Sequence, residues 1–352
     1  MKKCLVLTTV NKPSEAVRRF IRTDYDVIVV GDRKTPGDYR SLDCVFLDLR
    51  AQHKQFRKIS KHLPLDSYSR KNIGYLYAIR NGYDVIAESD DDNIAYDDWG
   101  RLDQPARGRW RTVTAPAYPN MYSLYTGELI WPRGFPLEKI HAGEDILAEE
   151  KDADVFIVQS LADGDPDVDA VFRLVLGGRG GGREGGREFV FDRPEPGKGE
   201  PGKGAWALDK GVLSPFNSQN TFWINRAAFP YLYLPATVPF RCCDIVRGYV
   251  AQHGIWRRGG QLAFTAASVR QHRNPHDLIE DFRSETPLYL HFHKMMEAVN
   301  SATLDGGDGD LLAMYRALHK AGLVAKHELR LVREWLKLAA ETSAPLSGSG
   351  AS

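Results

Sequence analysis

The sequence Asp84-Val85-Ile86-Ala87-Glu88-Ser89-Asp90-Asp91-Asp92-Asn93 joins an apolar run to three consecutive carboxylates. Residues 84–88 have the continuous apolar character of a strand that is covered on both faces. Adjacent carboxylates repel one another, so their charges are unfavourable at a strand end unless a cation neutralises them. Side chains alternate along an extended chain, so Asp90 and Asp92 point the same way and can share one divalent ion. The alternative is a solvated acidic turn.

Strand and helix patterns alternate upstream of this acid run. Residues 4–8, 26–30 and 43–47 are further apolar runs, and Ser14 is placed to cap a helix after the first of them. The spacing predicts another helix over residues 66–81, which Gly82 ends. This order predicts an α/β fold with a mostly parallel central sheet and helices on both faces. Such sheets bind ligands beyond the carboxyl ends of their strands, which favours the metal interpretation.

Two positively charged side chains are predicted to lie near the acid run. The helix over residues 66–81 must run antiparallel to the strand that follows it, so Arg70 and Lys71 at its start belong to the same sheet edge. There they would meet the charge of a bound diphosphate, although both could instead be surface partners of the acids. The first strand lacks GxGxxG, and no P-loop motif occurs. Together these features predict a nucleotide-sugar enzyme that uses Mn²⁺ or Mg²⁺.

The composition excludes several classes of protein. Lys and Arg number 47 against 46 Asp and Glu, and this balance argues against a nucleic-acid-binding protein. No sequence run approaches the ~18–20 apolar residues of a membrane span. The four cysteines form no CxxC or disulfide framework. We therefore expect a cytoplasmic protein, which would lie at the inner face of the membrane if its acceptor is lipid-linked.

The chain is predicted to hold one catalytic domain and a helical extension. Residues 1–100 would form a nucleotide-binding half and residues 101–300 an acceptor half, interrupted by a flexible Gly-rich loop at 177–204. Phe189 lies in the part of that loop that reads as a short hairpin strand. The apolar pattern predicts two helices within residues 301–341, which separate near Gly322. The last residues, 342–352, are predicted to form a disordered tail.

Five blocks of sequence resemble the STELLO-type glycosyltransferase family. They are residues 63–79 with the acid run, 161–170 with Arg173, 215–221, 239–248 (Pro-Phe-Arg-Cys-Cys-Asp-Ile-Val-Arg-Gly) and 271–278. More distantly, the acid run is similar to that of reversibly glycosylated polypeptides and UDP-arabinopyranose mutases. The resemblance implies a GT-A-type nucleotide-sugar-binding fold in which the acid run is a DxD-type metal site.

The same resemblance implies roles for individual residues. Asp90 and Asp92 would hold the metal, with Asp90 and Asp91 also near the nucleotide sugar. His272 and His276 are the candidates for a third metal ligand, with His276 preferred, although a lone histidine is more often a structural hydrogen-bonder. The early strand ends of such folds bind the nucleotide, so the predicted base and ribose contacts are Thr8, Thr9, Asn11 and Asp32.

Asp244 is the predicted catalytic base. An inverting glycosyltransferase needs a carboxylate to take the proton of the acceptor hydroxyl, and Asp244 follows an apolar-flanked cysteine pair. The alternatives are a helix N-cap, or an ion-pair partner of Arg241 or Arg247. In a retaining enzyme Asp244 could lie near the anomeric carbon without acting as a base.

Acceptor binding is predicted for two polar segments. Aspartates alternate after the apolar run 154–158, although Pro166 makes a turn or a calcium-like loop the alternative there. Amide side chains follow Phe216, and amides can recognise sugar hydroxyls by hydrogen bonding. The predicted acceptor residues are Asp165, Asp167, Asp169, Asn217, Gln219, Asn220 and Arg247.

These features predict a metal-dependent glycosyltransferase that acts in surface polysaccharide biosynthesis. It would move a sugar from a nucleotide-diphospho-sugar, with UDP expected as the nucleotide, to a glycan or a lipid-linked saccharide. One alternative is a nucleotide-sugar mutase or self-glycosylating protein. The other is a noncatalytic partner that organises glycosyltransferases.

Overall fold

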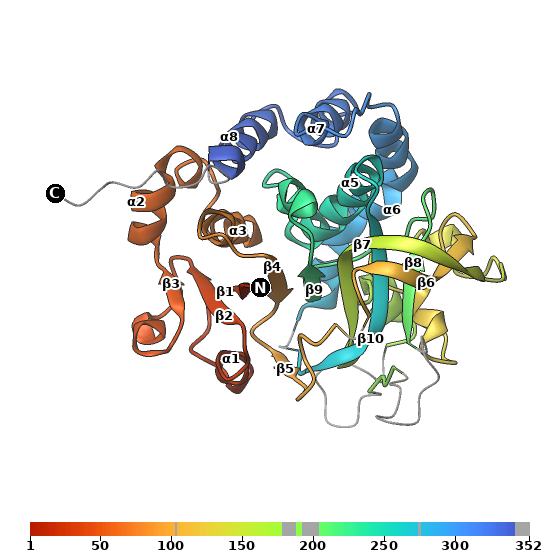
Figure 1. Ribbon diagram of the computed structural model, residues 1–352, viewed down its shortest axis with the longest axis horizontal. Coiled ribbons are helices and arrows are strands. Elements are labelled where there is room, and N and C mark those ends of the chain that lie inside the picture. The colour runs from red at the N-terminus through yellow and green to blue at the C-terminus, as the bar shows by residue number, and fades with distance from the viewer. Residues whose placement is uncertain (103, 178–187, 192–203, 274–275, 342–352) are drawn as a thin grey trace.

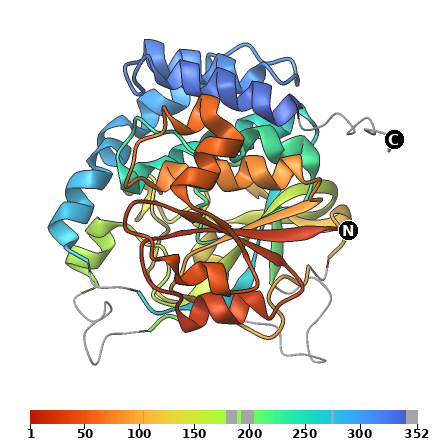
Figure 2. The ribbon, with the colours of Figure 1, turned by 90° about the vertical axis from the view of Figure 1, so that its left-hand side faces the viewer.

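The computed structural model describes residues 1–102, 104–177, 188–191, 204–273 and 276–341. Figure 1 and Figure 2 show one twisted sheet with helices packed on both of its faces. The strands described are β1 (Lys3–Thr9), β2 (Asp26–Gly31), β3 (Val45–Leu47), β4 (Val85–Ser89), β5 (Asn93–Ala95), β6 (Arg107–Ala115), β7 (Leu147–Gly164), β8 (Ala205–Leu208), β9 (Asn220–Trp223) and β10 (Gln261–Gln271). The α-helices described are α1 (Glu15–Ile21), α2 (Leu49–Ser60), α3 (Lys71–Arg80), α4 (Ala170–Val175), α5 (Cys243–Arg257), α6 (Leu278–Asn300), α7 (Asp310–Lys320) and α8 (Glu328–Glu341).

The first four strands form the parallel part of the sheet, in the order β3-β2-β1-β4. Ser14 caps α1, as predicted, because its hydroxyl accepts the N–H of Val17. Helix α3 lies close against this part of the sheet at Gly74. A Cβ atom at Gly74 would come within 2.4 Å of Val6 and 2.7 Å of Val30, so only glycine permits that approach.

The prediction of a mostly parallel sheet is wrong beyond β4. The full strand order is β3-β2-β1-β4-β9-β7-β6-β8-β10-β5, and β9 runs antiparallel to both of its neighbours. β7 is antiparallel to β6 but parallel to β10, and β10 is antiparallel to β8 and β5. The fold is therefore mixed α/β, because the second half of the chain adds its strands without the repeated helical crossovers that a parallel sheet requires.

The alternation of side chains along β1 separates two apolar cores. Cys4 and Val6 face a layer that includes α2, α3 and the C-terminal helices. Leu5 and Leu7 face the opposite layer, where Phe20 of α1 is packed. Both sets are fully buried, so the central strands are covered on both faces, as their unbroken apolar pattern predicts.

The C-terminal helices lie on the same side of the sheet as α3. Helix α8 packs against α2, α3 and α7, and a left-handed residue, Gly322, separates α7 from α8. Phe189 forms an isolated antiparallel bridge with Gly164. Residues 178–187 and 192–203 of the predicted loop, and the predicted tail at 342–352, lie outside the described residues. Within the described ranges, no helix has the length and apolar character to cross a membrane.

Candidate active site

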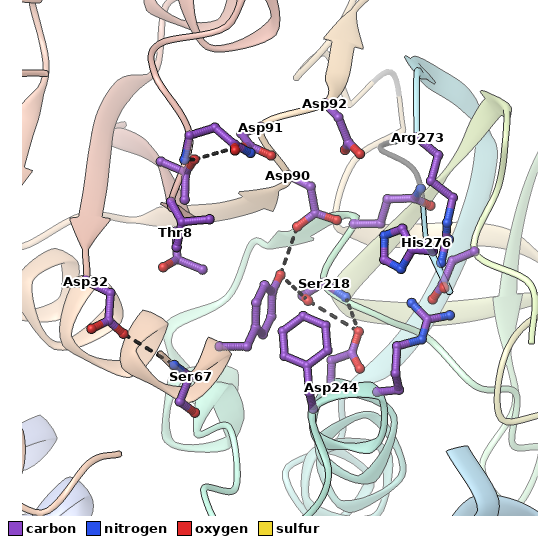
Figure 3. Close-up of a pocket in the computed structure, with 18 of the residues that line it drawn as sticks. Thr8, Asp32, Ser67, Asp90, Asp91, Asp92, Ser218, Asp244, Arg273 and His276 are labelled. Carbon is purple, nitrogen blue, oxygen red and sulfur yellow. Dashed lines mark hydrogen bonds between the residues drawn. The ribbon is translucent and has the colours of Figure 1, made fainter. Parts of the chain in front are cut away.

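A cavity of about 400 Å³ opens where several strand ends and helix starts meet. Figure 3 shows Thr8, Asp32 and Ser67 on one side, Arg273 and His276 on the other, and Asp90 and Asp92 between them. The complete lining is Thr8, Thr9, Val10, Asn11, Asp32, Lys34, Asp66, Ser67, Tyr68, Asp90, Asp91, Asp92, Arg133, Asp167, Ser218, Gln219, Phe240, Arg241, Asp244, Gln271, Arg273 and His276. The cavity thus lies at the carboxyl ends of β1, β2 and β4, where an open sheet binds its ligands.

Asp90 stands directly after β4 and accepts a hydrogen bond of 3.0 Å from the Tyr68 hydroxyl. That hydroxyl also contacts Ser218 at 2.7 Å and accepts a 2.8 Å bond from Lys71. Burial raises the pKa of Asp90 to about 7; the Lys71 charge opposes the shift, and the charge of Asp92 adds to it. Negative charge is therefore costly at Asp90 unless a cation lies nearby.

The other two acids are held by different neighbours. Asp91 accepts hydrogen bonds from the Thr9 hydroxyl and, at 2.9 Å, from the Asn11 side chain, so it connects the acid run to β1. Asp92 accepts the Gln271 amide of β10 at 3.3 Å. The acid run is therefore fastened to both sides of the cavity.

The carboxylate oxygens of the acid run are ligands of the type that a divalent cation takes. A hard cation such as Mg²⁺ binds one or two carboxylates and takes its other ligands from water and substrate phosphates. Within the described ranges, no group of three or more His, Cys, Asp or Glu side chains is gathered closely enough to form a complete protein site. Asp90 and Asp92 would then hold the ion, and bound substrate would have to complete its coordination.

The predicted third ligand, His276, contacts a different group in this arrangement. It lines the cavity, but its Nδ1 lies 3.3 Å from Asp281 of α6. Asp281 also accepts a 3.1 Å bond from Arg273 and lies 3.7 Å from Arg241. Burial alone would raise the pKa of Asp281, but contact with these cationic partners holds the pKa below its ordinary value. Asp281 thus orients three basic side chains along one wall of the cavity.

Arg133 forms the end of the cavity that faces α5. Its guanidinium donates to Asp167 at 2.9 and 2.7 Å and to Asp244 at two distances of 2.9 Å. A further bond reaches the carbonyl oxygen of Arg241. Burial alone would raise the pKa of Asp244, but Arg133, with Arg247 and Arg241, lowers it to about 2. Asp244 is therefore ionised at neutral pH and firmly ion-paired.

The residues predicted to contact the nucleotide surround the opposite end of the cavity. Thr8 donates to the Val30 carbonyl at 3.0 Å, which fixes its hydroxyl between β1 and β2. Asp32 follows β2 and accepts the backbone N–H groups of Arg33 at 2.8 Å and Ser67 at 3.3 Å. Two strand ends and the loop before α3 are thereby joined into one polar surface.

Arg70 and Lys71 lie at the predicted sheet edge, but their side chains point inward and neither lines the cavity. Arg70 donates to Gln52 of α2, and Lys71 donates to Tyr68 and to the Ser89 carbonyl at 3.1 Å. Both are buried, so they support the surrounding loops. Lys71 acts on the cavity through Tyr68, whereas Arg70 lies 3.9 Å from Asp32, which lines it.

Five of the predicted acceptor residues lie outside the cavity lining. Asp165 pairs with Arg173, and Asp169 caps α4 while accepting the Trp131 ring N–H. The other contacts are Asn217 with the Gln219 backbone, Asn220 with Trp99 and Ser268, and Arg247 with Glu88. Asp167 and Gln219 are the two of the seven that reach the cavity.

Sequence reasoning missed Tyr68, Arg133 and Gln271, which all line the cavity. Arg133 carried a usable signal, since it interrupts the apolar segment 130–135 and a buried charge needs a partner. The partners themselves lie 34 and 111 residues away, so no local pattern names them.

Two curated proteins of Arabidopsis thaliana match most of this sequence. Probable glycosyltransferase STELLO2 is 29% identical over 313 residues, which cover 84% of this chain and 39% of that protein. Probable glycosyltransferase STELLO1 is 27% identical over an alignment of 361 positions, which spans 96% of this chain and 44% of that protein. The chain is similar to the STELLO glycosyltransferases. The resemblance predicted from the sequence blocks is confirmed.

This chain spans less than half the length of either STELLO protein. No family model matches the sequence.

Proposed function

We propose that this protein is a metal-dependent glycosyltransferase with a GT-A-type arrangement that uses a nucleotide-diphospho-sugar, with UDP as the nucleotide. The observation that carries the proposal is the acid run at the end of β4, which lines a cavity large enough for a sugar nucleotide. The STELLO proteins, which are named as probable glycosyltransferases, support the same reaction class.

The acid run supplies the charge that such a reaction requires. Asp90 and Asp92 would hold a divalent ion, which when bound would supply Lewis-acid stabilisation for a departing diphosphate. Tyr68 keeps Asp90 in place through its 3.0 Å hydrogen bond, and Gln271 keeps Asp92 in place. Preorganised ligands lose little freedom when the ion and the donor bind.

The two ends of the cavity suit different parts of the substrates. The polar surface of Thr8, Asn11 and Asp32 would bind the nucleoside, because its hydroxyl, amide and carboxylate groups match base and ribose atoms. The end formed by Asp167 and Gln219 would bind the acceptor, a glycan or a lipid-linked saccharide of surface polysaccharide biosynthesis. The donor phosphates would lie between these ends.

Asp244 has a limited capacity as the catalytic base. A carboxylate with a pKa of about 2 has a low proton affinity, and both of its oxygens are already bonded to Arg133. The geometry suits a second role at least as well, in which Asp244 and Arg133 together orient an acceptor hydroxyl. Asp244 as the base remains a prediction.

A screen of nucleotide sugars for hydrolysis with and without Mn²⁺ tests the proposal. We expect one UDP-sugar to be hydrolysed only when the metal is present, with faster release of UDP when the correct acceptor is added. Ring isomerisation without an acceptor would instead identify a mutase, and sugar attached to the protein itself would identify a self-glycosylating protein. Absence of metal-dependent UDP binding would favour the noncatalytic partner.

A further inference from the structure

A second cavity, of about 230 Å³, lies between the segment 237–242, α6 and the end of α7. Leu318 and Cys242 line its floor and are almost completely buried, whereas Pro239 and His291 are exposed at its rim. The cavity therefore has a closed inner end and an opening to solvent. No part of the predicted catalytic machinery lines it.

The chemistry of this second cavity excludes most ligands. Apolar side chains such as Leu288 and Met295 make up most of the surface, and none of the lining residues is Asp, Glu, Lys or Arg. A sugar or a nucleotide would lose hydrogen bonds to water there without replacement. A hydrocarbon chain would lose nothing, because burying apolar surface is favourable.

One short segment separates the second cavity from the candidate active site. Phe240 and Arg241 line the active-site cavity, while Pro239 and Cys242 on either side of them line the apolar cavity. The 3₁₀ turn Phe240–Cys242 spans about 6 Å at ~2 Å per residue. Phe240 is 57% exposed, so this segment presents an apolar ring to solvent at the active-site cavity.

We propose that the apolar cavity binds the hydrocarbon chain of a lipid-linked saccharide acceptor while its saccharide occupies the candidate active site. The proposal rests on the function proposed above and names the class of acceptor. A methylene is about the size of a water molecule, roughly 30 Å³ in the liquid, so the cavity holds about eight carbons. It is too small for a folded protein segment, and it takes the part of the chain nearest the saccharide.

Alkyl phosphates of four to twelve carbons provide the test, and calorimetry without donor or metal measures their binding. Each methylene buried in the cavity should tighten binding by about fourfold. We expect this gain to continue to about eight carbons and then stop, because the cavity is full. Geranyl phosphate and octyl phosphate compare an isoprenoid with a straight chain, and inorganic phosphate measures the head group alone. Equal affinity for butyl and octyl phosphate would overturn the proposal.

Val238→Trp places a large ring in the cavity from its partly exposed side. This variant should bind octyl phosphate at least tenfold more weakly than the wild type. Leu290→Trp is the matched control, because Leu290 is 71% exposed and does not line the cavity. Unchanged octyl affinity in folded Val238→Trp would place the chain elsewhere and refute the site.

Leu288→Ala keeps the test decisive if the tryptophan variant does not fold. Leu288 lines the cavity and is 7% exposed, so its truncation enlarges the space. The chain length at which affinity stops rising should increase by two or three carbons, and an unchanged limit would contradict the proposal. Alkyl binding without nucleotide-sugar hydrolysis would count against the proposed function alone, and hydrolysis without alkyl binding would count against the apolar site alone.

Discussion

Arg133→Met tests the buried ion pairs at the α5 end of the candidate active site. The Arg133 side chain is 6% exposed and binds two carboxylates, Asp167 and Asp244, whose side chains are 7% and 8% exposed. Methionine removes the shared cation and leaves two buried acids side by side. Loss of one partner of a buried ion pair typically costs about 3–5 kcal/mol, so we expect the free energy of unfolding at pH 7 to fall by that amount.

The pH dependence of stability provides an independent test of the Arg133–Asp244 ion pair. The pKa of Asp244 is about 2 in the folded protein and about 3.9 when unfolded. A lowered folded-state pKa stabilises the fold above pH ~4, and this stabilisation is lost as the pH falls through 2. By linkage this contribution is about 2–3 kcal/mol. Without Arg133 the lowering disappears, so Arg133→Met should lose less stability than the wild type between pH 5 and pH 3.

Urea unfolding monitored by tryptophan fluorescence measures both effects. Arg109→Met is the matched control, because the Arg109 side chain is 64% exposed and lies 4.0 Å from Asp152. We expect the control to change the unfolding free energy by less than about 0.5 kcal/mol. The double variant Arg133→Met/Asp244→Asn should recover part of the loss, since one uncompensated charge is gone. Wild-type stability and pH dependence in Arg133→Met would refute the assignment.

Three further predictions concern the carboxylates below and beside the cavity. Glu88→Gln should lower the unfolding free energy by about 3–5 kcal/mol, because Glu88 is fully buried and holds Arg247 at 2.8 Å. Denaturant titration measures the change, with Asp84→Asn as the control, because the Asp84 side chain is 41% exposed. The raised pKa of Asp90 means that metal-free stability should fall as pH rises from about 4 to 7, and thermal melts of Asp90→Asn should lack this decline. If Asp244 is the base, Asp244→Asn should lower kcat at least a hundredfold in steady-state assays with the acceptor; a smaller change with a raised acceptor KM would assign it to orientation.

The parallel strands were predictable because their sequences are simple. The centres of β1, β2 and β4 are apolar runs buried on both faces (residues 4–7, 27–30 and 85–87), so each pattern had one reasonable interpretation. Helix α2 escaped detection because its sequence is mostly polar and few of its side chains, such as Phe56 and Ile59, reach the core. β6 carries three arginines among its first five residues, which conceals a strand in the interior of a large sheet.

The candidate site was predictable where chemistry was concentrated locally. Three consecutive acids after a strand are recognisable from the sequence alone. The structure places Asp90, Asp91 and Asp92 in the cavity lining. Buried ion pairs such as Glu88 with Arg247 were not predictable, because their partners lie 159 residues apart. Arg247 was therefore predicted to bind an acceptor, although its side chain is 1% exposed and supports the strand that presents the acid run.

Calorimetric titration of UDP in the presence and absence of Mn²⁺ tests the central claim most directly, with wild type, Asp92→Asn and the exposed control Asp97→Asn. We predict that UDP binds wild type and Asp97→Asn only with Mn²⁺, and that Asp92→Asn binds at least tenfold more weakly. UDP affinity that is the same with and without Mn²⁺, or the same in Asp92→Asn as in wild type, would contradict the assignment of the acid run as a metal and diphosphate site.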